Sequence, residues 1–436
     1  MRKRGWGVLI AAVVVAATLI GCSQKSSSSA EKPKVTLRFA TQSMTDATGV
    51  VTKGILSDFM AKNPNVTISI ESYPGNDLIT AINTEVMAGN TPDVFTFWRP
   101  ESGWNVPSYA KAGALANLTA LSKSPALKDL FPAYAWRTAS EIDGIVYCIP
   151  RTSYYDEFVV NKALFNKYGI PLPATWADLV SGITALKSHG IIPWVNTTGA
   201  LLDDSSRLFF NILNNQVGNQ KALDLMEGKA SWLQPDVMPA LQAFVTVAAN
   251  NGPPDQAVLS TTQAISKYLN TGKAAMMLDN NGQINSNISK EALPDMVPLP
   301  FPVLPGGVEK SPTTEADVTN LVYASAKAYA DPAKKPYIDQ LIIDLVDKKA
   351  ATAYVEQAGL TVPQLGLTIN QALVPKFIID ANEIANKEPG QKWLLSFVSA
   401  NNRSTFRDII NKVWYGTMNA QQLRDALQSG LYGKTS

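Results

Sequence analysis

Cysteine and histidine are nearly absent from this chain of 436 residues, which contains two cysteines and one histidine. So few ligands of these types make a structural zinc site implausible, and no acidic run resembles a calcium-binding loop. The sequence contains no Gly-x-Ser-x-Gly elbow, no His-Glu-x-x-His motif and no phosphate-binding loop ending in Gly-Lys. These patterns give no support to the enzyme classes that depend on them, and we expect no metal and no cofactor.

A large net charge of one sign is also lacking. The formal net charge is +2, and Arg2, Lys3 and Arg4 at the very start carry positive charge, so that the remainder is close to neutral. A near-neutral body gives no electrostatic case for binding nucleic acid. Hydrophobic residues make up 46% and charged residues 17% of the chain, which is typical of a globular protein. At this length one hydrophobic core is rarely enough, so we expect two lobes.

The apolar run near the start, Val8–Ile20, is too short to span a bilayer. As a helix it covers about 20 Å, whereas the hydrocarbon core is about 30 Å thick. Preceded by basic residues, it is typical of an export signal. The run ends in Leu-Ile-Gly-Cys22, which resembles the bacterial lipobox. That resemblance implies a signal peptide over residues 1–21, lipidation of Cys22 with palmitate among the acyl chains, and anchoring at the extracytoplasmic face of the cell membrane.

The segment that follows is polar and rich in serine. We expect residues 22–34 to form a disordered tether between the membrane and the folded part. The other cysteine, Cys148, then has no partner within the chain. It lies in the apolar run 145–149, which favours a buried, inert thiol over a reactive one.

Hydrophobic periodicity predicts an α/β fold. Alternating apolar residues indicate strands, and apolar residues every three or four positions indicate helices. The two patterns alternate at the start of the folded part as strand, helix, strand, helix and strand, over residues 35–39, 51–59, 66–70, 78–86 and 94–98. This order is typical of a parallel sheet covered by helices on both faces.

Beyond Thr175 the pattern is mainly helical. We expect helices over 176–187, 207–214, 239–249, 261–269, 335–346 and 405–414, strands over 274–278 and 318–324, and proline-rich coil over 293–305. No fixed repeat is present, which argues against a solenoid or a propeller.

Four short segments occur in a characteristic order. They are Ala-Gly-Asn-Thr-Pro-Asp-Val at 88–94, Asp-Gly-Ile-Val-Tyr-Cys-Ile-Pro at 143–150, Pro-Ala-Thr-Trp-Ala-Asp-Leu at 173–179 and Thr-Gly-Lys-Ala-Ala-Met at 271–276. Each alone is a modest turn or packing signal. In this order, behind a lipobox, they resemble the family 1 extracellular solute-binding proteins, relatives of the maltose-binding protein. The resemblance extends from Val35 to Tyr432.

The resemblance implies a periplasmic-binding-protein-like fold with two lobes, each a mostly parallel sheet flanked by helices, joined by a hinge. We expect the N-terminal lobe to comprise residues 35–150 and 296–332, and the C-terminal lobe 151–295 and 333–436. It further implies a monomer that captures a small solute, most simply a sugar or oligosaccharide, between the lobes and delivers it to the permease subunits of an ABC importer.

Candidate ligand residues combine aromatic rings, which stack on the apolar side of a sugar, with carboxylates and amides, which bond hydroxyls. They follow predicted strands, lie at the expected crossing between the lobes, or occupy positions where relatives have ligand contacts. The candidates are Trp98, Glu101, Trp104, Tyr154, Tyr155, Trp194, Asp279, Asn280, Asn281, Glu315 and Asp317.

Each candidate also has a plainer interpretation. Trp98 and one of the two tyrosines could be packing residues, and Glu101 could be a solvated loop charge. The acidic pair Glu315 and Asp317 could lie on a surface loop. At 279–283 and 315–317 the chain departs from its relatives, which often carry a Gly-x-Trp pattern and glycines there. The departures indicate a more polar site, or one that accepts a cationic group.

Two other functions remain open on the same sequence. A secreted glycoside-acting enzyme needs only a pair of carboxylates at a controlled separation, which sequence alone does not exclude. A lipoprotein adhesin or sensor could use the same fold without transport, since fold does not determine function.

Overall fold

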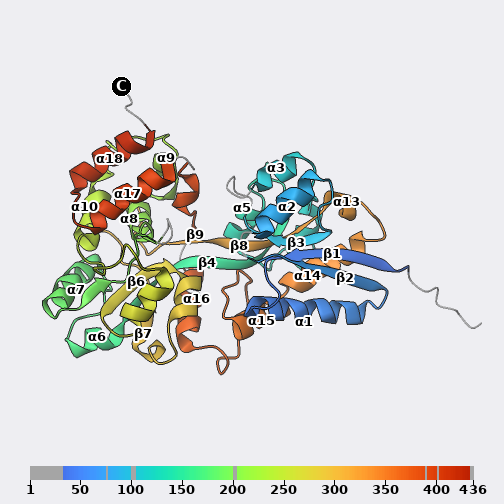
Figure 1. The fold of residues 1–436 in the computed structure, drawn as a ribbon, viewed down its shortest axis with the longest axis horizontal. Coiled ribbons are helices and arrows are strands. Elements are labelled where there is room, and N and C mark those ends of the chain that lie inside the picture. The colour runs from blue at the N-terminus through green and yellow to red at the C-terminus, as the bar shows by residue number, and fades with distance from the viewer. Residues whose placement is uncertain are drawn as a thin grey trace, which may run out of the picture.

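A computed structural model describes residues 33–74, 77–99, 105–199, 204–387, 390–399 and 402–432. The predicted signal peptide, Cys22, Glu101 and Trp104 lie outside these residues. Figure 1 shows two lobes side by side, with strands β4 (Cys148–Asn161) and β8 (Thr314–Ala324) running from one lobe into the other. The two-lobed α/β architecture predicted from the sequence is confirmed. None of the described helices is both long and apolar enough to cross a membrane.

The N-terminal lobe is built from three strands and the helices around them. Its elements are β1 (Val35–Thr41), α1 (Ala47–Lys62), β2 (Val66–Ser72), α2 (Asp77–Met87), β3 (Val94–Phe97), α3 (Val106–Lys111), α4 (Thr119–Ser122), α5 (Ala133–Ala139), α13 (Ala326–Tyr329), α14 (Lys335–Val346) and α15 (Lys348–Ala358).

The C-terminal lobe contains shorter strands and more helices. Its elements are α6 (Lys162–Lys167), α7 (Trp176–Ser188), β5 (Ile192–Trp194), α8 (Arg207–Val217), α9 (Asn219–Met226), α10 (Met238–Ala248), α11 (Thr261–Ala264), the π-helix Ile265–Leu269, β6 (Ala274–Asn280), α12 (Asn281–Asn287), the 3-10 turn Leu293–Asp295, β7 (Met296–Leu299), α16 (Lys376–Lys387), β9 (Gly390–Gln391), the 3-10 turn Leu394–Phe397, α17 (Arg403–Trp414) and α18 (Ala420–Tyr432).

One sheet continues through both lobes, in the order β2-β1-β3-β8-β4-β6-β5. Strand β1 pairs in parallel with β2 and β3, and β5 with β6, whereas β8 and β4 pair antiparallel with their neighbours. The first half of β4 pairs with β8 and its second half with β6 and β7. Because β4 belongs to both halves of the sheet, it mechanically joins the two lobes.

Local signals explain where several helices begin. The Asp46 carboxylate accepts a hydrogen bond from the Gly49 backbone N–H (2.7 Å) at the start of α1. At the start of α7, Thr175 Oγ1 accepts from the Asp178 N–H (3.2 Å) and Asp178 accepts from the Thr175 N–H (2.9 Å). These reciprocal bonds satisfy N–H groups that have no partner within the helix. The helix expected over 176–187 is thus confirmed, and Thr175 caps it.

Each lobe has its own hydrophobic core. Cys148 is fully buried in the core of the N-terminal lobe, where burial raises the pKa of its thiol to about 12, as expected of an inert cysteine. Trp414 lies in the core of the C-terminal lobe and donates its indole N–H to the Ser205 carbonyl (2.8 Å). A third cluster joins α1 and α15 of one lobe to α16 and β6 of the other at the hinge.

The lobe boundaries differ from the sequence-based expectation in two places. Residues 296–304, expected in the N-terminal lobe, include β7, which pairs with β4, and Phe301, which is buried in the C-terminal core. Helices α14 and α15, expected in the C-terminal lobe, belong to the N-terminal lobe: α14 buries Ile338 and Leu341 in its core, and α15 packs against α1. Apolar periodicity shows that a segment has a buried face, but it does not show which core receives that face.

Candidate binding cleft

A polar pocket lies where the carboxyl ends of β1 and β3 meet the two crossing strands. Its volume is ≈ 190 Å³. The pocket, here called the cleft pocket, is lined by Thr41, Gln42, Ser43, Asp46, Thr48, Thr96, Trp98, Arg151, Thr152, Thr319, Asn320 and Leu360. In α/β sheets ligands bind outside the carboxyl ends of the strands, which is the position of this pocket.

Hydroxyl groups dominate the lining, and several are already held in place. Thr41 and Thr96 share a hydrogen bond between their hydroxyls (2.8 Å), and so do Thr152 and Thr319 (3.0 Å). Such groups both donate and accept, and each retains capacity for a ligand hydroxyl. Trp98 is half-buried and is the one aromatic residue among the described residues that line the pocket. The arrangement suits a ligand with many hydroxyls and one apolar face.

Arg151 supplies the positive charge of the cleft pocket. Its guanidinium donates to the Asn320 side-chain carbonyl (3.2 Å) and to the Thr52 hydroxyl (3.2 Å). It also lies over the Tyr354 ring, 4.8 Å from the ring centroid. These contacts come from α1, β8 and α15, so the cation is fixed in position by three elements before any ligand arrives.

Beside the cleft pocket the two lobes touch. Arg99, from the end of β3, donates to the Tyr154 hydroxyl (3.1 Å) and lies 3.6 Å from the Asp317 carboxylate. Its guanidinium also lies over the Trp393 ring of the C-terminal lobe, 5.3 Å from the centroid. Lys392 pairs with Glu141 across the same gap (2.6 Å). The structure therefore has the lobes in direct contact at this edge.

Asp317 and Glu315 lie on β8, buried, which rules out the surface-loop alternative. Asp317 accepts from the Thr138 hydroxyl (2.5 Å) and the Val318 N–H (2.8 Å). Glu315 accepts from the Leu394 N–H (3.0 Å). Burial raises the pKa of both carboxyls, and repulsion from Asp156 raises that of Glu315 further. Both side chains hold elements of the hinge together in this arrangement.

Asp279 belongs to a second buried charge cluster, centred on Arg207 of α8. The guanidinium contacts the Asp156 carboxylate of β4, and its Nε lies 3.0 Å from the Asp279 carboxylate of β6. Asn211, one turn further along α8, donates to the other oxygen of Asp156 (3.0 Å). The cluster ties a helix of the C-terminal lobe to two central strands.

Three further candidates, Asn280, Asn281 and Tyr155, make contacts within the protein at the hinge. Asn280 caps α12 by accepting from the Gly282 N–H (2.8 Å). Asn281 accepts from the Tyr155 N–H (3.2 Å) and donates to the Thr361 hydroxyl. Tyr155 is buried against Ala381 of α16. These three residues lie at the hinge, outside the lining of the cleft pocket.

Trp194 lies in the core of the C-terminal lobe. It is 1% exposed, packs against Phe158 and donates its indole N–H to the Val247 carbonyl (2.9 Å). A ring enclosed in this way offers no face to a solute, so we leave Trp194 out of the proposed site.

The candidates chosen from the sequence did not include most of the hydroxyl groups that line the cleft pocket, nor Arg151 and Trp393. The rule that selected Trp98, a position just after a strand, applies equally to Gln42 and Ser43 after β1. No local signal singles out Thr319 or Trp393, because each approaches the cleft only through long-range packing.

Glu157 is a carboxyl group buried on the hinge strand. It is 2% exposed and faces Pro298, Leu299 and α16 across a very small cavity. Burial raises its pKa well above the ordinary value, and the nearby Tyr155 hydroxyl opposes that rise. The folded state therefore retains a proton that the unfolded state loses above a pH of about 4.3.

We expect Glu157→Gln to stabilise the protein increasingly as pH rises. A raised folded-state pKa means that wild-type stability falls with pH, so the variant gains about 1 kcal/mol or more at pH 8 and little at pH 4. Urea denaturation at both pH values measures the difference. Glu383→Gln, at a side chain 63% exposed, is the control and should show no such trend. Equal stability of Glu157→Gln and wild type at pH 8 would contradict the expectation.

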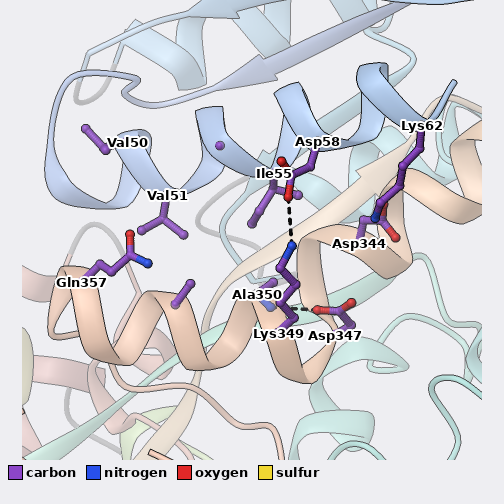
Figure 2. Close-up of a pocket in the computed structure, with 12 residues that line it drawn as sticks. Val50, Val51, Ile55, Asp58, Lys62, Asp344, Asp347, Lys349, Ala350 and Gln357 are labelled. Atoms are coloured by element: carbon purple, nitrogen blue, oxygen red, sulfur yellow. Dashed lines mark hydrogen bonds and ion pairs between the residues drawn. The ribbon is translucent and has the colours of Figure 1, made fainter. Parts of the chain in front are cut away.

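A second cavity, of ≈ 200 Å³, lies between α1 and α15 (Figure 2). Its charged residues pair across it: Lys349 with Asp58 (2.9 Å) and Lys62 with Asp344 (3.7 Å). Three of these four side chains are more than half exposed, and such surface pairs contribute little to stability. The cavity lies within one lobe, so closure of the lobes does not complete it.

The comparison with known families agrees with this geometry. The model of the family "Bacterial extracellular solute-binding protein" matches residues 41–361. The chain is 27% identical over 177 residues to the multiple sugar-binding protein of Streptococcus mutans, covering 40% of this chain and 39% of that one. It is 25% identical over 179 residues to the melibiose/raffinose/stachyose-binding protein MelE of Bacillus subtilis, again covering 40% and 39%. The matches thus span about two fifths of these relatives' length.

Solved structures show the same fold over nearly the whole chain. A probable secreted solute-binding lipoprotein from Streptomyces coelicolor superposes with a TM-score of 0.77 at 15% identity, covering 91% of this chain and 98% of that one. The solute-binding protein RafE in complex with raffinose superposes with a TM-score of 0.68 at 19% identity, covering 91% and 99%. With two lobes, crossing strands and a polar pocket beside them, this chain belongs to the bacterial extracellular solute-binding proteins.

Proposed function

We propose that this protein captures a sugar or oligosaccharide in the cleft pocket and delivers it to the permease subunits of an ABC importer. The observation that carries the proposal is the lining itself, in which paired threonine hydroxyls and amides surround one half-buried indole, Trp98. Sugars present hydroxyls at their edges and C–H groups on their faces, so this lining complements both. Relatives named for binding sugars support the same assignment.

Delivery requires that the loaded protein differ from the empty one, and contact between the lobes can provide this difference. Arg99 and Trp393 meet across the lobes, as do Lys392 and Glu141. A solute bridging the cleft would favour this arrangement, because only then do both lobes contact it. The closed form would present a surface that an open, empty form does not, which allows a permease to distinguish them.

We further propose that Cys22 carries the lipid anchor and that the mature protein, a monomer, works on the extracytoplasmic face of the cell membrane. The lipobox-like sequence before Cys22 supports this placement. In this proposal binding is reversible and no bond of the solute is broken.

Thermal denaturation with a sugar panel tests the proposal. The panel includes melibiose, raffinose, stachyose, galactose, xylo-oligosaccharides and chitin oligosaccharides. At about 100 times its Kd a sugar stabilises the native state by about 2.7 kcal/mol, which raises Tm by several degrees. Chromatography of the same mixtures should show intact sugar. A panel without any shift would point to a non-carbohydrate solute, and sugar turnover would establish an enzyme instead.

A further inference from the structure

A large cavity on the hinge is separate from the cleft pocket. It measures ≈ 380 Å³, and the two cavities share no lining residue. Its walls are α15, the loop 360–371 and α16, so it lies between an N-terminal-lobe helix and a C-terminal-lobe helix (Figure 1). A volume of this size is within the range of pockets that hold small molecules.

The walls of this cavity, here called the hinge pocket, are mostly aliphatic. The apolar residues are Val355, Val362, Leu365, Leu367, Ile369 and Ile379. Leu365 is 43% exposed, so the hinge pocket is open to solvent at this residue. Among the residues described in this part of the chain, no lysine or arginine belongs to the lining.

The loop that forms one wall is fixed to α15 at both ends. The Leu360 N–H donates to the Tyr354 carbonyl (3.1 Å), and the Asn370 N–H donates to the Glu356 carboxylate (2.6 Å). Lys348 donates to the Gly366 carbonyl between them (3.2 Å). The hinge pocket is therefore formed before any guest binds, which lowers the cost of binding.

Two buried amide oxygens in the lining have no hydrogen-bond partner among the described residues. One is Gln364 Oε1, on a residue 5% exposed, and the other is Asn382 Oδ1. The Gln364 Nε2 is held by the Val346 carbonyl (2.9 Å), so the oxygen is the end of this amide without a partner among the described residues. A buried acceptor without a partner costs free energy, which a donor from a guest would recover.

We propose that the hinge pocket is a second binding site, for a small hydrophobic amine. The aliphatic walls would enclose an apolar body, and the Gln364 and Asn382 oxygens would accept from its ammonium group. Glu383, which also pairs with Lys387 (3.5 Å), places a negative charge at the lining, opposite in sign to the ammonium group. An anionic guest of the same shape would bring no donor to these two oxygens, so the site favours the amine over it.

Titration calorimetry with 4-phenylbutylamine tests the site in the full chain. We expect saturable binding with a Kd of about 1 mM or tighter, and binding of 4-phenylbutyrate at least about tenfold weaker. Absence of amine binding, or equal binding of the carboxylate, overturns the proposal. Neither added sugar nor Trp98→Ala should change the affinity for the amine. A failure of amine binding is therefore distinguishable from a failure of sugar binding in the cleft pocket.

Two substitutions locate the amine within the hinge pocket. Ile379→Trp fills the cavity and should abolish binding, whereas Asn382→Leu keeps the volume, removes one acceptor and should weaken binding about fivefold. Leu233→Trp, at an exposed leucine of the C-terminal lobe, is the matched control and should bind as wild type does. If Ile379→Trp does not fold, Asn382→Leu decides alone. Unchanged affinity in the folded variants overturns the assignment.

Discussion

Arg207→Leu is expected to lower the free energy of unfolding by about 3–5 kcal/mol, because two buried carboxylates lose a cation that lies between them. The Asp156 and Asp279 side chains are 0% and 3% exposed, and both contact Arg207. Each would remain ionised without this partner or would have to take up a proton, and both outcomes cost free energy. Urea denaturation measures the loss.

A surface ion pair provides the matched control for Arg207. Lys221 of α9 contacts Asp236 at 2.5 Å, but the two side chains are 28% and 53% exposed. We expect Lys221→Leu to change the free energy of unfolding by less than about 1 kcal/mol. A similar loss in the two variants would show that the buried cluster is no more important than a solvated pair.

Trp98→Ala is expected to weaken sugar binding about 100-fold, since it removes the aromatic ring that the described part of the chain contributes to the cleft pocket. Trp98→Phe keeps an aromatic face and should recover much of the affinity. Titration calorimetry with the sugar selected by the thermal panel measures both. The ring also packs edge-on against Phe97 at 5.1 Å, so Tm is measured alongside.

Trp136→Ala is the control for lost packing. Trp136 lies in the same lobe and packs edge-on against Phe131 at 5.1 Å, but it is not part of the cleft pocket. We expect its loss to reduce stability while leaving sugar affinity within about twofold of wild type. Wild-type affinity in Trp98→Ala would falsify the assignment of the sugar to this pocket.

Charged residues contribute to the contact between the two lobes. Arg99 faces Trp393 across the gap and at the same time lies beside Asp317 of the crossing strand β8. Its position is thus set by both lobes and by the hinge. The buried carboxyls Glu315 and Asp317 adjoin this contact, which makes the hinge sensitive to any change in their hydrogen bonds.

Much of the secondary structure was predictable because its causes are local. The Thr175 cap, the helix over 176–188 and the opening order of strands and helices follow from side-chain pattern and hydrogen-bonding groups a few residues apart. The strand β7 was missed, because Pro298 and the prolines on either side of the strand suggested coil. Pairing with β4 overrides that local preference at a position beside the hinge.

The candidate site was harder to predict, and the tryptophans show why. Trp98 and Trp194 both follow strands, yet Trp98 lines the cleft pocket and Trp194 is enclosed by the C-terminal core. Their local sequences do not distinguish these environments. The difference depends on which helices cover each strand end, which is decided by contacts between segments distant in the chain.

The amino-acid order by itself determined the alternation of strands and helices, the two-lobed α/β architecture and the solute-binding character of the chain, since periodicity, caps and short motifs act over a few residues. Only the tertiary structure decided which lobe receives α14 and β7, that Arg207 joins Asp156 to Asp279, and that threonines of β1, β3, β4 and β8 share one pocket. Those contacts join residues far apart in the chain, and packing of the two cores brings them together.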